Sequence, residues 1–288
     1  MLGYSRQSYY QGIKYAHQKA YEADLLVGEV LRHRKLQKRL GTRKMLHEMS
    51  DFLVAHQFSI GRDALFDLLA ERGLLVTKRK RRGCITTFSR HRFKKYPNLI
   101  QGFIPTGPNQ LWVSDITYIY VGKGFAYLSL ITDAYSHKIV GFYLNRDLSA
   151  KGPLMALKMA LAANTSINGL VHHSDRGMQY CCEAYVVLLE KKNAKISMTQ
   201  NGDPRENAVA ERVNGILKQE LLEEAYSNFE TAQKAIVVAC NTYNHLRPHS
   251  SIDNLKPVEA QLKTGEIKKL WKNYYQIKKQ KKEVEMEV

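Results

Sequence analysis

The sequence predicts an α/β domain with a mixed sheet, preceded by an all-α unit. Between residues 25 and 75 the apolar side chains recur at helical spacing. From residue 111 onward the pattern changes to β-rich segments with partial alternation, and then to alternating helices and strands. Three antiparallel strands followed by helix and strand segments are typical of a mixed sheet covered by helices.

The helical unit is expected to contain three helices. A break at residues 40–42 separates the first from the second, and a short segment ending at Ser59, a candidate N-cap, separates the second from the third. Two helices that meet at a short turn are typical of a helix-turn-helix, and a plain three-helix bundle is the alternative. Residues 1–24 are predicted to form a short helix leading into this unit, without a heptad repeat before residue 25.

Positive charge favours the helix-turn-helix interpretation. The chain of 288 residues has a net charge of +17, and residues 1–110 hold 21 Lys and Arg (counted from the sequence) against 8 Asp and Glu. A polyanionic partner such as DNA is therefore expected. The basic ends of the chain would hold its nearly neutral middle part, the expected catalytic domain, on that DNA. The cations expected to contact DNA in this part are Arg43, Lys44, Lys78, Arg79, Lys80, Arg81 and Arg82.

The chain divides into five predicted parts. They are an N-terminal segment at 1–24, the helical unit with its basic run at 25–82, a Gly- and Pro-rich linker at 83–108, the α/β domain at 109–265 and a basic tail at 266–288. Within the α/β domain, strands are predicted at 111–121, 125–134, 138–145, 169–175 and 194–199, and helices at 149–164, 183–192, 207–224 and 229–245.

Several functional classes are disfavoured by the composition. The four cysteines contain no C-x-x-C pair, so neither a disulfide framework nor a zinc ribbon is expected. No signal peptide is recognised, and no apolar run approaches the ~18 residues that a membrane span needs. A location in a reducing cytoplasm is expected.

Three carboxylates carry the candidate chemistry. Asp115 lies within a predicted strand, Asp175 follows one, and Glu211 lies on a predicted helix, with 59 and then 35 residues between them by subtraction. Two-metal phosphoryl transfer needs carboxylates that flank a pair of divalent cations, and hard oxygen ligands suit Mg²⁺. A structural acid with a partner is the alternative for Asp115, and a turn-forming role is the alternative for Asp175.

Helical spacing gives a test for Glu211. At 100° per residue one face of its helix is apolar, and the opposite face presents Asn207, Glu211 and Lys218 together. Lys218 is therefore expected to hold a DNA phosphate near the metal ions, with Asn207 beside it. A merely solvated face is the alternative, and Glu206 is the competing acid.

Other side chains of metal-binding type are assigned structural roles. Asp133 is predicted to be a strand-end or turn residue rather than a ligand. His172 and His173 are adjacent on a strand, point to opposite sides and are therefore expected to pack or to contact phosphate. The adjacent Cys181 and Cys182 fail as a chelate for a similar reason.

Several motifs, in this order, resemble those of one family, the transposases of the IS-three group of bacterial insertion sequences. The resemblance is to the product of the second reading frame of these elements. The matching segments are LGTRKML, PNQLWVSDITYI, ITDAYSHKIVGF, HHSDRGMQY, ENAVAERVNGILKQEL and YNHLRPHSSIDNLKPVEA, with the D-D-35-E spacing of that group. The resemblance implies an RNase H-like catalytic core in which Asp115, Asp175 and Glu211 bind two Mg²⁺ or Mn²⁺ ions.

The same resemblance implies an activity and partners. It implies metal-dependent cleavage at the terminal inverted repeats of a transposon, followed by attack of the released 3′-hydroxyl on target double-stranded DNA. It also implies a homo-oligomer on DNA and an upstream-frame DNA-binding protein as a further partner. The alternatives are a non-catalytic DNA-binding partner of that upstream protein and a general RNase H-type nuclease, which usually carries a fourth carboxylate near the site.

Overall fold

The computed structural model describes residues 5–79, 91–164, 167–200 and 204–270. The predicted DNA contacts Lys80, Arg81 and Arg82 lie outside these ranges. The chain forms two compact units, one running up to Arg81 and including Gln219–Leu221, and the other comprising the remaining residues. Within the described ranges, no helix combines the length and apolar content that crossing a bilayer would require.

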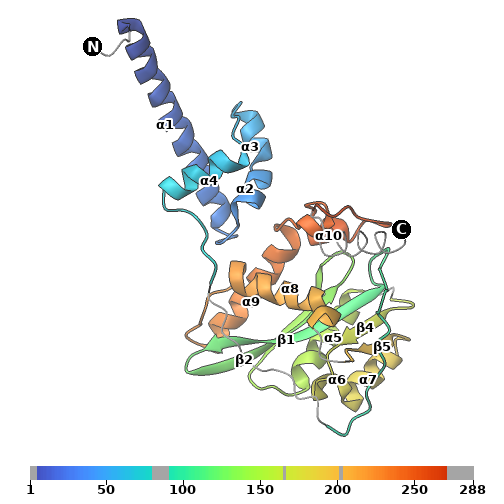
Figure 1. Cartoon of the computed structure of the whole chain (residues 1–288). Helices are drawn as coiled ribbons and strands as arrows, with labels where there is room; N and C mark the ends of the chain where they lie inside the picture. The colour runs from blue at the N-terminus through green and yellow to red at the C-terminus, as the bar shows by residue number, and fades with distance from the viewer. Residues whose placement is uncertain (1–4, 80–90, 165–166, 201–203, 271–288) are drawn as a thin grey trace, which may run out of the picture. The chain divides into compact units, whose positions relative to one another are not determined.

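The first unit is all-helical (Figure 1). Its helices are α1 (Arg6–Arg34), α2 (Thr42–Glu48), α3 (Ser50–Ala55) and α4 (Arg62–Glu71). The short N-terminal helix predicted for residues 1–24 is instead continuous with the next one, because no proline interrupts α1. The predicted second helix is divided at Met49, and Gly61 rather than Ser59 precedes α4, without a side-chain cap.

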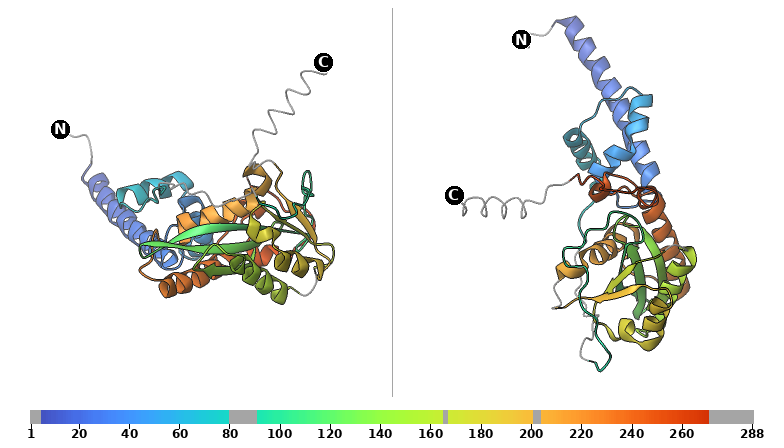
Figure 2. Two further views of the ribbon diagram at one scale, coloured as in Figure 1. Left: turned by 90° about the horizontal axis from the view of Figure 1, so that it is seen from below. Right: turned by 90° about the vertical axis from the view of Figure 1, so that its right-hand side faces the viewer.

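The core of this unit forms where the C-terminal end of α1 meets the shorter helices. Val30 of α1, Met45 of α2 and Leu65 and Leu69 of α4 are fully buried in one cluster. Side chains at this helical spacing face a common interior, as the sequence pattern predicts. The N-terminal part of α1 extends beyond α2, α3 and α4 (Figures 1 and 2).

The second unit is built on a five-stranded sheet of order β3-β2-β1-β4-β5. The strands are β1 (Leu111–Val121), β2 (Gly124–Asp133), β3 (Ile139–Asn145), β4 (Val171–Ser174) and β5 (Lys195–Met198). The first three are antiparallel, whereas β4 and β5 run parallel to β1. This mixed order is the RNase H-like arrangement, so the predicted fold class is confirmed.

Alternation along β1 divides its side chains between two faces of the sheet. Trp112 and Ile116 point into the main core, which they share with α5 (Lys151–Ala163), α6 (Met178–Cys181) and α7 (Glu183–Glu190). Leu111 and Val113 point to the other face and pack on Ala210 of α8 (Ala208–Ile216). Since successive strand residues alternate, Asp115 shares the α8 face with Val113.

Helix α5 approaches the sheet closely at Gly141 of β3. A Cβ atom at this position would lie only 2.2 Å from the carbonyl oxygen of Ala156 and 3.0 Å from the Cβ of Ala160. No larger residue fits without moving the helix, so glycine here sets the distance between α5 and the sheet.

The helix predicted at 207–224 has three different parts. A 3-10 turn (η1, Pro204–Asn207) precedes α8, and a π-helical turn (η2, Leu217–Leu221) follows it. The uniform 100° spacing used in the prediction therefore fails at both ends. Helix α9 (Phe229–His245) matches its predicted range and is capped by Asn228, whose Oδ1 accepts from Thr231 N at 2.8 Å. A short 3-10 turn (η3, Ser250–Ile252) and α10 (Pro257–Ala260) complete the order of elements.

The predicted linker forms part of the second unit where it is described. Residues 91–110 contain no helix or strand. However, Met198 N of β5 donates to Pro97 O at 3.2 Å, and Leu99 N donates to Ser197 Oγ at 2.8 Å. This segment is therefore held against the edge of the sheet rather than spanning open solvent.

Candidate active site

The strand register brings the first two predicted acids together. In the parallel pair of β1 and β4, Val113 lies opposite His173. Two residues further along each chain, Asp115 and Asp175 reach the same level, at the carboxyl end of β4. Neighbouring strands lie about 5 Å apart, so both carboxylates are within reach of a shared ligand. Open α/β sheets usually bind their ligands at this end of a strand.

Asp115 is partly buried and held by two hydrogen bonds. Its Oδ1 accepts from the backbone N of Ile116 at 2.9 Å, and its Oδ2 accepts from Asn214 Nδ2 at 2.7 Å. Burial raises the pKa of the Asp115 carboxyl to about 7, and the negative charges of Asp175 and, to a smaller extent, Glu211 contribute to the rise. The site therefore concentrates negative charge around Asp115.

Asp175 is oriented by the loop that follows β4. Its Oδ1 accepts from Gly177 N at 2.9 Å. A Cβ atom at Gly177 would lie 3.0 Å from that same oxygen. The glycine therefore leaves the space that the carboxylate occupies, and the turn holds the orientation of Asp175.

Helix α8 carries the third acid across β1. Glu211 is exposed on its surface, while Ala210 is buried against Leu111 and Val113. Asn214, three residues after Glu211 and on the same side of the helix, donates the hydrogen bond to Asp115 described above. Helix α8, which bears Glu211, is thus hydrogen-bonded directly to Asp115.

Asn214 is the site residue that sequence reasoning missed. Its Oδ1 is buried and has no hydrogen-bond partner among the described residues. The signal was present in the sequence, because a residue three positions after a helical Glu shares its face. Asparagine is uncharged and was not considered as a site residue. Its hydrogen bond to Asp115 depends on the packing of α8 on β1, which the sequence does not show.

The residues fit a divalent cation only in part. Among the described residues, no group of three His, Cys, Asp or Glu side chains is arranged to hold a metal ion. The donor set is nevertheless one of carboxylates, which hard cations prefer. A divalent ion would also relieve the repulsion that raises the pKa of Asp115. Asp115 and Asp175 are therefore brought together, and Glu211 lies on the adjoining helix without completing a closed set.

The structure does not place Asn207 on an outer face with Glu211. Asn207 is buried in the 3-10 turn, and its Nδ2 donates to Ser114 O of β1 at 3.0 Å. Lys218 is partly buried in the π-helical turn, where the angle per residue differs from that of an α-helix. The prediction was wrong for Asn207, because it assumed one uniform helix from 207 to 224. A place for Lys218 beside Glu211 stays a prediction.

The competing acids have other partners. The Asp133 carboxylate accepts from the backbone N of Asn109 at 2.6 Å and from Ser136 N at 2.8 Å, so it closes the turn after β2 as predicted. Burial is the main reason why the pKa of Asp133 is raised. Glu206 Oε2 accepts from Gln200 N at 2.6 Å.

The histidine pair is structural, as predicted. His172 Nε2 lies 2.8 Å from Ser114 Oγ and 2.9 Å from Tyr185 OH, and His173 Nδ1 lies 2.8 Å from Ser197 Oγ. Burial lowers the pKa of His172 to about 3 and that of His173 to about 4. Both rings are therefore neutral and fasten β4 to its neighbours.

A buried tyrosine borders the acids. Tyr180 of α6 is 2% exposed, and its hydroxyl has no hydrogen-bond partner among the described residues. Its pKa is raised well above the usual value, first by burial and then by the charge of Asp175. The ring packs edge-on against Tyr185 at 5.5 Å between centroids, so the Asp175 side of the site has an aromatic wall.

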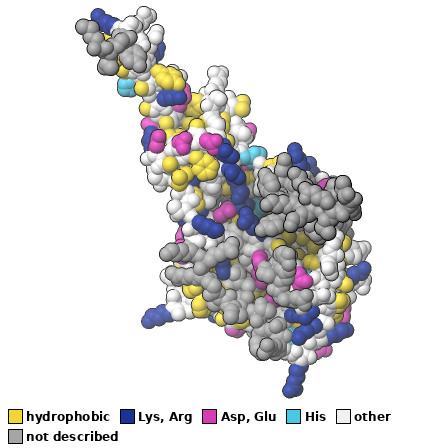
Figure 3. All heavy atoms as spheres, viewed as in Figure 1, with side chains coloured by type: hydrophobic (Ala, Val, Ile, Leu, Met, Phe, Trp, Pro, Cys, Tyr) yellow, Lys and Arg dark blue, Asp and Glu magenta, His cyan; other side chains and the backbone are white. Residues whose placement is uncertain are grey.

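The predicted DNA contacts in the helical unit differ in exposure. Arg43 and Lys78 are exposed. Lys44 is partly buried, with its Nζ 3.6 Å from Glu220 of the same unit. Arg79 is partly buried, and its backbone N donates to Gln219 Oε1 at 3.2 Å. Lys and Arg side chains gather on this unit in the face shown in Figure 3.

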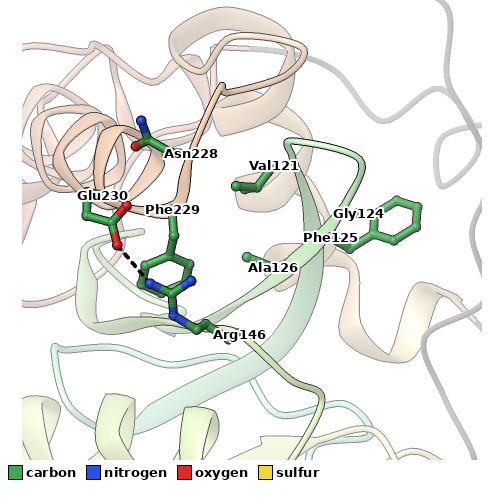
Figure 4. Close-up of a pocket in the computed structure, with 8 residues that line it drawn as sticks. All are labelled: Val121, Gly124, Phe125, Ala126, Arg146, Asn228, Phe229 and Glu230. Atoms are coloured by element: carbon green, nitrogen blue, oxygen red, sulfur yellow. Dashed lines mark hydrogen bonds and ion pairs between the residues drawn. The ribbon is translucent and has the colours of Figure 1, made fainter.

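A separate hollow lies at the end of the β1–β2 hairpin (Figure 4). It is lined by Val121, Gly124, Phe125, Ala126, Arg146, Asn228, Phe229 and Glu230. Arg146 stacks on the Phe229 ring at 4.1 Å and pairs with Glu230 at 2.7 Å. The charged residues of this hollow, Arg146 and Glu230, are paired with each other, and none of the three candidate acids lines it. Catalysis is therefore expected at the three acids rather than in this hollow.

Comparisons with known proteins identify the family of this chain. Residues 105–204 and 192–257 each match the Integrase core domain family. The "Insertion element IS600 uncharacterized 31 kDa protein" of Shigella sonnei is 34% identical over 264 residues, covering 89% of this chain and 94% of that protein. The "Transposase for insertion sequence element IS629" from the same species is 30% identical, covering 77% and 73%.

The HTLV-2 integrase catalytic core domain, solved in complex with magnesium, aligns with a TM-score of 0.43 and 18% identity, over 55% of this chain and 99% of that one. Family membership rests on the sequence relatives instead. They and the matched domain define an integrase-type core, which is that of a polynucleotidyl transferase. The chain belongs to the insertion-sequence transposases of the IS-three group, and the resemblance seen in its motifs is confirmed.

Proposed function

We propose that this chain is a DNA transposase that cleaves DNA at the ends of an insertion element and joins those ends to target DNA. The observation that carries the proposal is the meeting of Asp115 and Asp175 at the carboxyl end of β4, with α8 fastened across them by Asn214. The sequence relatives favour this role over a non-catalytic DNA-binding partner.

The three acids are the proposed metal ligands. Asp115, Asp175 and Glu211 would hold two Mg²⁺ or Mn²⁺ ions, which would activate the attacking oxygen and stabilise charge on the leaving oxygen. Asn214 would keep Asp115 in its ligating orientation, and Gly177 would do the same for Asp175. Burial and the charge of Asp175 raise the pKa of Asp115, and bound cations would favour its ionised form.

The reaction would proceed in two displacements at phosphorus. In the first, a water oxygen bonds to phosphorus at the element end while the bond to the 3′-oxygen breaks, which leaves a free 3′-hydroxyl. In the second, that hydroxyl loses its proton and bonds to a target phosphorus, and the target strand's own 3′-oxygen leaves. Both steps use the same acids, and the protein forms no covalent bond.

The basic residues would bind the DNA backbone. Lys218, near the acids along the chain, would act as a flexible point charge on a phosphate, and Arg43 and Lys78 are exposed for contact in the helical unit. Buried Asn207 would act through β1 rather than by touching DNA. Two element ends must be joined together, so we infer a homo-oligomer on double-stranded DNA, with an upstream-frame protein as a further partner.

The test is a cleavage and joining assay. The full chain is incubated with labelled DNA carrying the terminal repeats of its element and with Mn²⁺, and nicked or joined products are expected. Asp175→Asn should abolish both products, whereas Asp147→Asn, which changes an exposed acid of the same unit, should not. Equal cleavage by the wild type and Asp175→Asn would refute the assignment of the acids.

A further inference from the structure

A short basic segment lies beside the Asp175 loop. Residues 91–96 belong to the predicted linker, and they contain lysines and an arginine but no acid. The segment is joined to the loop at its first residue, where His91 Nε2 donates to Arg176 O at 2.8 Å. A carbonyl oxygen can only accept, so this ring nitrogen carries the proton. Because Arg176 directly follows Asp175, the hydrogen bond brings the segment to the candidate active site.

The other end of the segment is anchored in the second unit. The Tyr96 ring packs against the main core cluster, and burial is the main reason why its pKa is raised. The next residue is held by the hydrogen bond from Met198 N of β5 to Pro97 O. The chain is therefore fixed on both sides of residues 92–95, which form the basic strap.

The basic strap presents cations and an aromatic ring to solvent. Its four residues, Arg92, Phe93, Lys94 and Lys95, are all exposed. The Phe93 side chain is 44% exposed, and its ring lies 5.5 Å from the His91 ring between centroids. Lys94 Nζ lies over the Tyr96 ring at 5.1 Å, so this cation has a partner within the segment. Arg92 and Lys95 are the cations that flank Phe93.

The strap and the acids act on a common neighbour. Burial and then the charge of Asp175 raise the pKa of the Cys181 thiol to about 11, and the positive charge of Lys95 opposes this rise. Lys95 and Asp175 therefore both lie near Cys181 of α6. This agrees with the hydrogen bond from His91 to Arg176, and it places the strap on the Asp175 side of the acids.

The composition of the strap favours nucleic acid as its partner. Cations near Asp175 would also offset the repulsion among the acids, but that role needs no aromatic side chain. A single exposed phenylalanine is ordinary, whereas one between two cations has the arrangement that binds a nucleic-acid strand. Bases stack on aromatic rings, and phosphates bind Lys and Arg. Within a duplex the bases stack on one another, so only terminal or unpaired bases have a face that Phe93 can contact.

We propose that the basic strap binds unpaired nucleotides at the end of a DNA strand beside the acids. Phe93 stacks on a base, and Arg92 and Lys95 bind the neighbouring phosphates. A strand held in this way is separated from its complement next to the acids. This inference rests on the proposed function for its choice of DNA as the partner.

The first test compares two DNA ends in EDTA, which prevents metal-dependent cleavage. One duplex has a short single-stranded extension that contains 2-aminopurine, and the other is the same duplex with a blunt end. The full chain should bind the extended end more tightly and quench the 2-aminopurine fluorescence by stacking. Phe93→Ala should lose this quenching and bind the extended end about fivefold or more weakly, with little change for the blunt end.

Two variants control for the loss of the ring. Phe93→Tyr keeps an aromatic side chain and should retain the quenching. Phe103 is 40% exposed in the same predicted linker, but residues 98–108 contain no Lys or Arg, so Phe103→Ala should bind like the wild type. Circular dichroism should show that Phe93→Ala keeps its fold. If Phe93→Ala binds and quenches like the wild type, the proposal is wrong.

The second test measures the contribution of the cations. Arg92→Ala and Lys95→Ala should each reduce the slope of log affinity for the extended end against log salt by about 0.7, the value for one single-stranded phosphate. Lys158→Ala changes an exposed lysine of α5, on the core face of the sheet, and should leave the slope unchanged. If Arg92→Ala and Lys95→Ala weaken binding to both ends equally, the strap binds duplex DNA and the proposal for unpaired nucleotides fails.

The tests separate this inference from the proposed function. Neither requires cleavage, so equal binding by Phe93→Ala and the wild type would overturn the role of the strap and leave the assignment of the acids intact. A chain that prefers the extended end through Phe93 but never cleaves DNA would support the strap and refute the proposed function.

Discussion

Replacing Asp115 by asparagine should stabilise the metal-free protein at alkaline pH. The pKa of Asp115 is raised from 3.8 to about 7. The folded state therefore holds this proton more tightly than the unfolded state, so the contribution of Asp115 to stability is present below about pH 4 and lost as pH rises through 7. A shift of about 3 units corresponds to at most ~4 kcal/mol, and partial exposure reduces the expected gain to ~2 kcal/mol.

The substitution preserves the local hydrogen bonding. The carbonyl oxygen of the introduced amide can accept from Ile116 N, and the Asn214 amide can rotate so that its unpartnered Oδ1 accepts from the introduced amide nitrogen. Urea unfolding in a metal chelator should show Asp115→Asn equal to the wild type near pH 4 and more stable at pH 8.

The matched control is Asp147→Asn. The pKa of Asp147 is lowered by its hydrogen bonds to Ser149, so this variant should be no more stable than the wild type at pH 8. Mg²⁺ should then stabilise the wild type but not Asp115→Asn. If Asp115→Asn is no more stable than the wild type at pH 8, the ionised Asp115 carboxylate does not destabilise the folded protein, and this interpretation is wrong.

Three further outcomes are expected. Asn214→Ala should lower DNA cleavage by about tenfold or more, since contacts that orient a ligand typically contribute about 10–100-fold. The urea midpoint of unfolding should change little. Normal activity of this variant would show that Asp115 does not need the hydrogen bond from Asn214. Gly141→Ala should destabilise the protein by ~2 kcal/mol or more in urea unfolding, because its Cβ meets Ala156 O, whereas Gly124→Ala, with open space around it, should change stability little. Arg43→Ala and Lys78→Ala should each reduce the slope of log affinity for duplex DNA against log salt by about 0.9, and an unchanged slope would remove that residue from the interface.

Much of the α/β domain could be predicted from local patterns. Alternation marks β1 and β2, and Gly122-Lys123-Gly124 marks the hairpin between them, because a turn and period-2 burial leave direct traces in sequence. The proximity of Asp115 to Asp175 was a hypothesis, since strand order depends on long-range packing that no local pattern records. The parallel pairing of β4 with β1 supplies that missing step.

Local predictions failed where the backbone departs from regular geometry. The helix predicted at 207–224 ends in a π-helical turn at Leu217–Leu221, and the 3-10 turn before α8 buries Asn207 against β1. Pro204 begins the 3-10 turn and Gly215 lies one residue before the end of α8, but neither residue specifies the type of helical turn that forms. The prediction divided α1 into two helices. The N-terminal half of α1 is polar and Tyr-rich, and it lacks the apolar residues of a helix that packs within its own unit.

The most direct test of the proposed site is to locate bound metal. Crystals of the chain with Mn²⁺ and a DNA end should show two anomalous peaks about 3.5–4 Å apart, each about 2.0–2.3 Å from carboxylate oxygens of Asp115, Asp175 or Glu211. All three residues should contribute a ligand. Manganese bound elsewhere in an active complex, or an active complex in which Glu211 contacts no ion, would contradict the account.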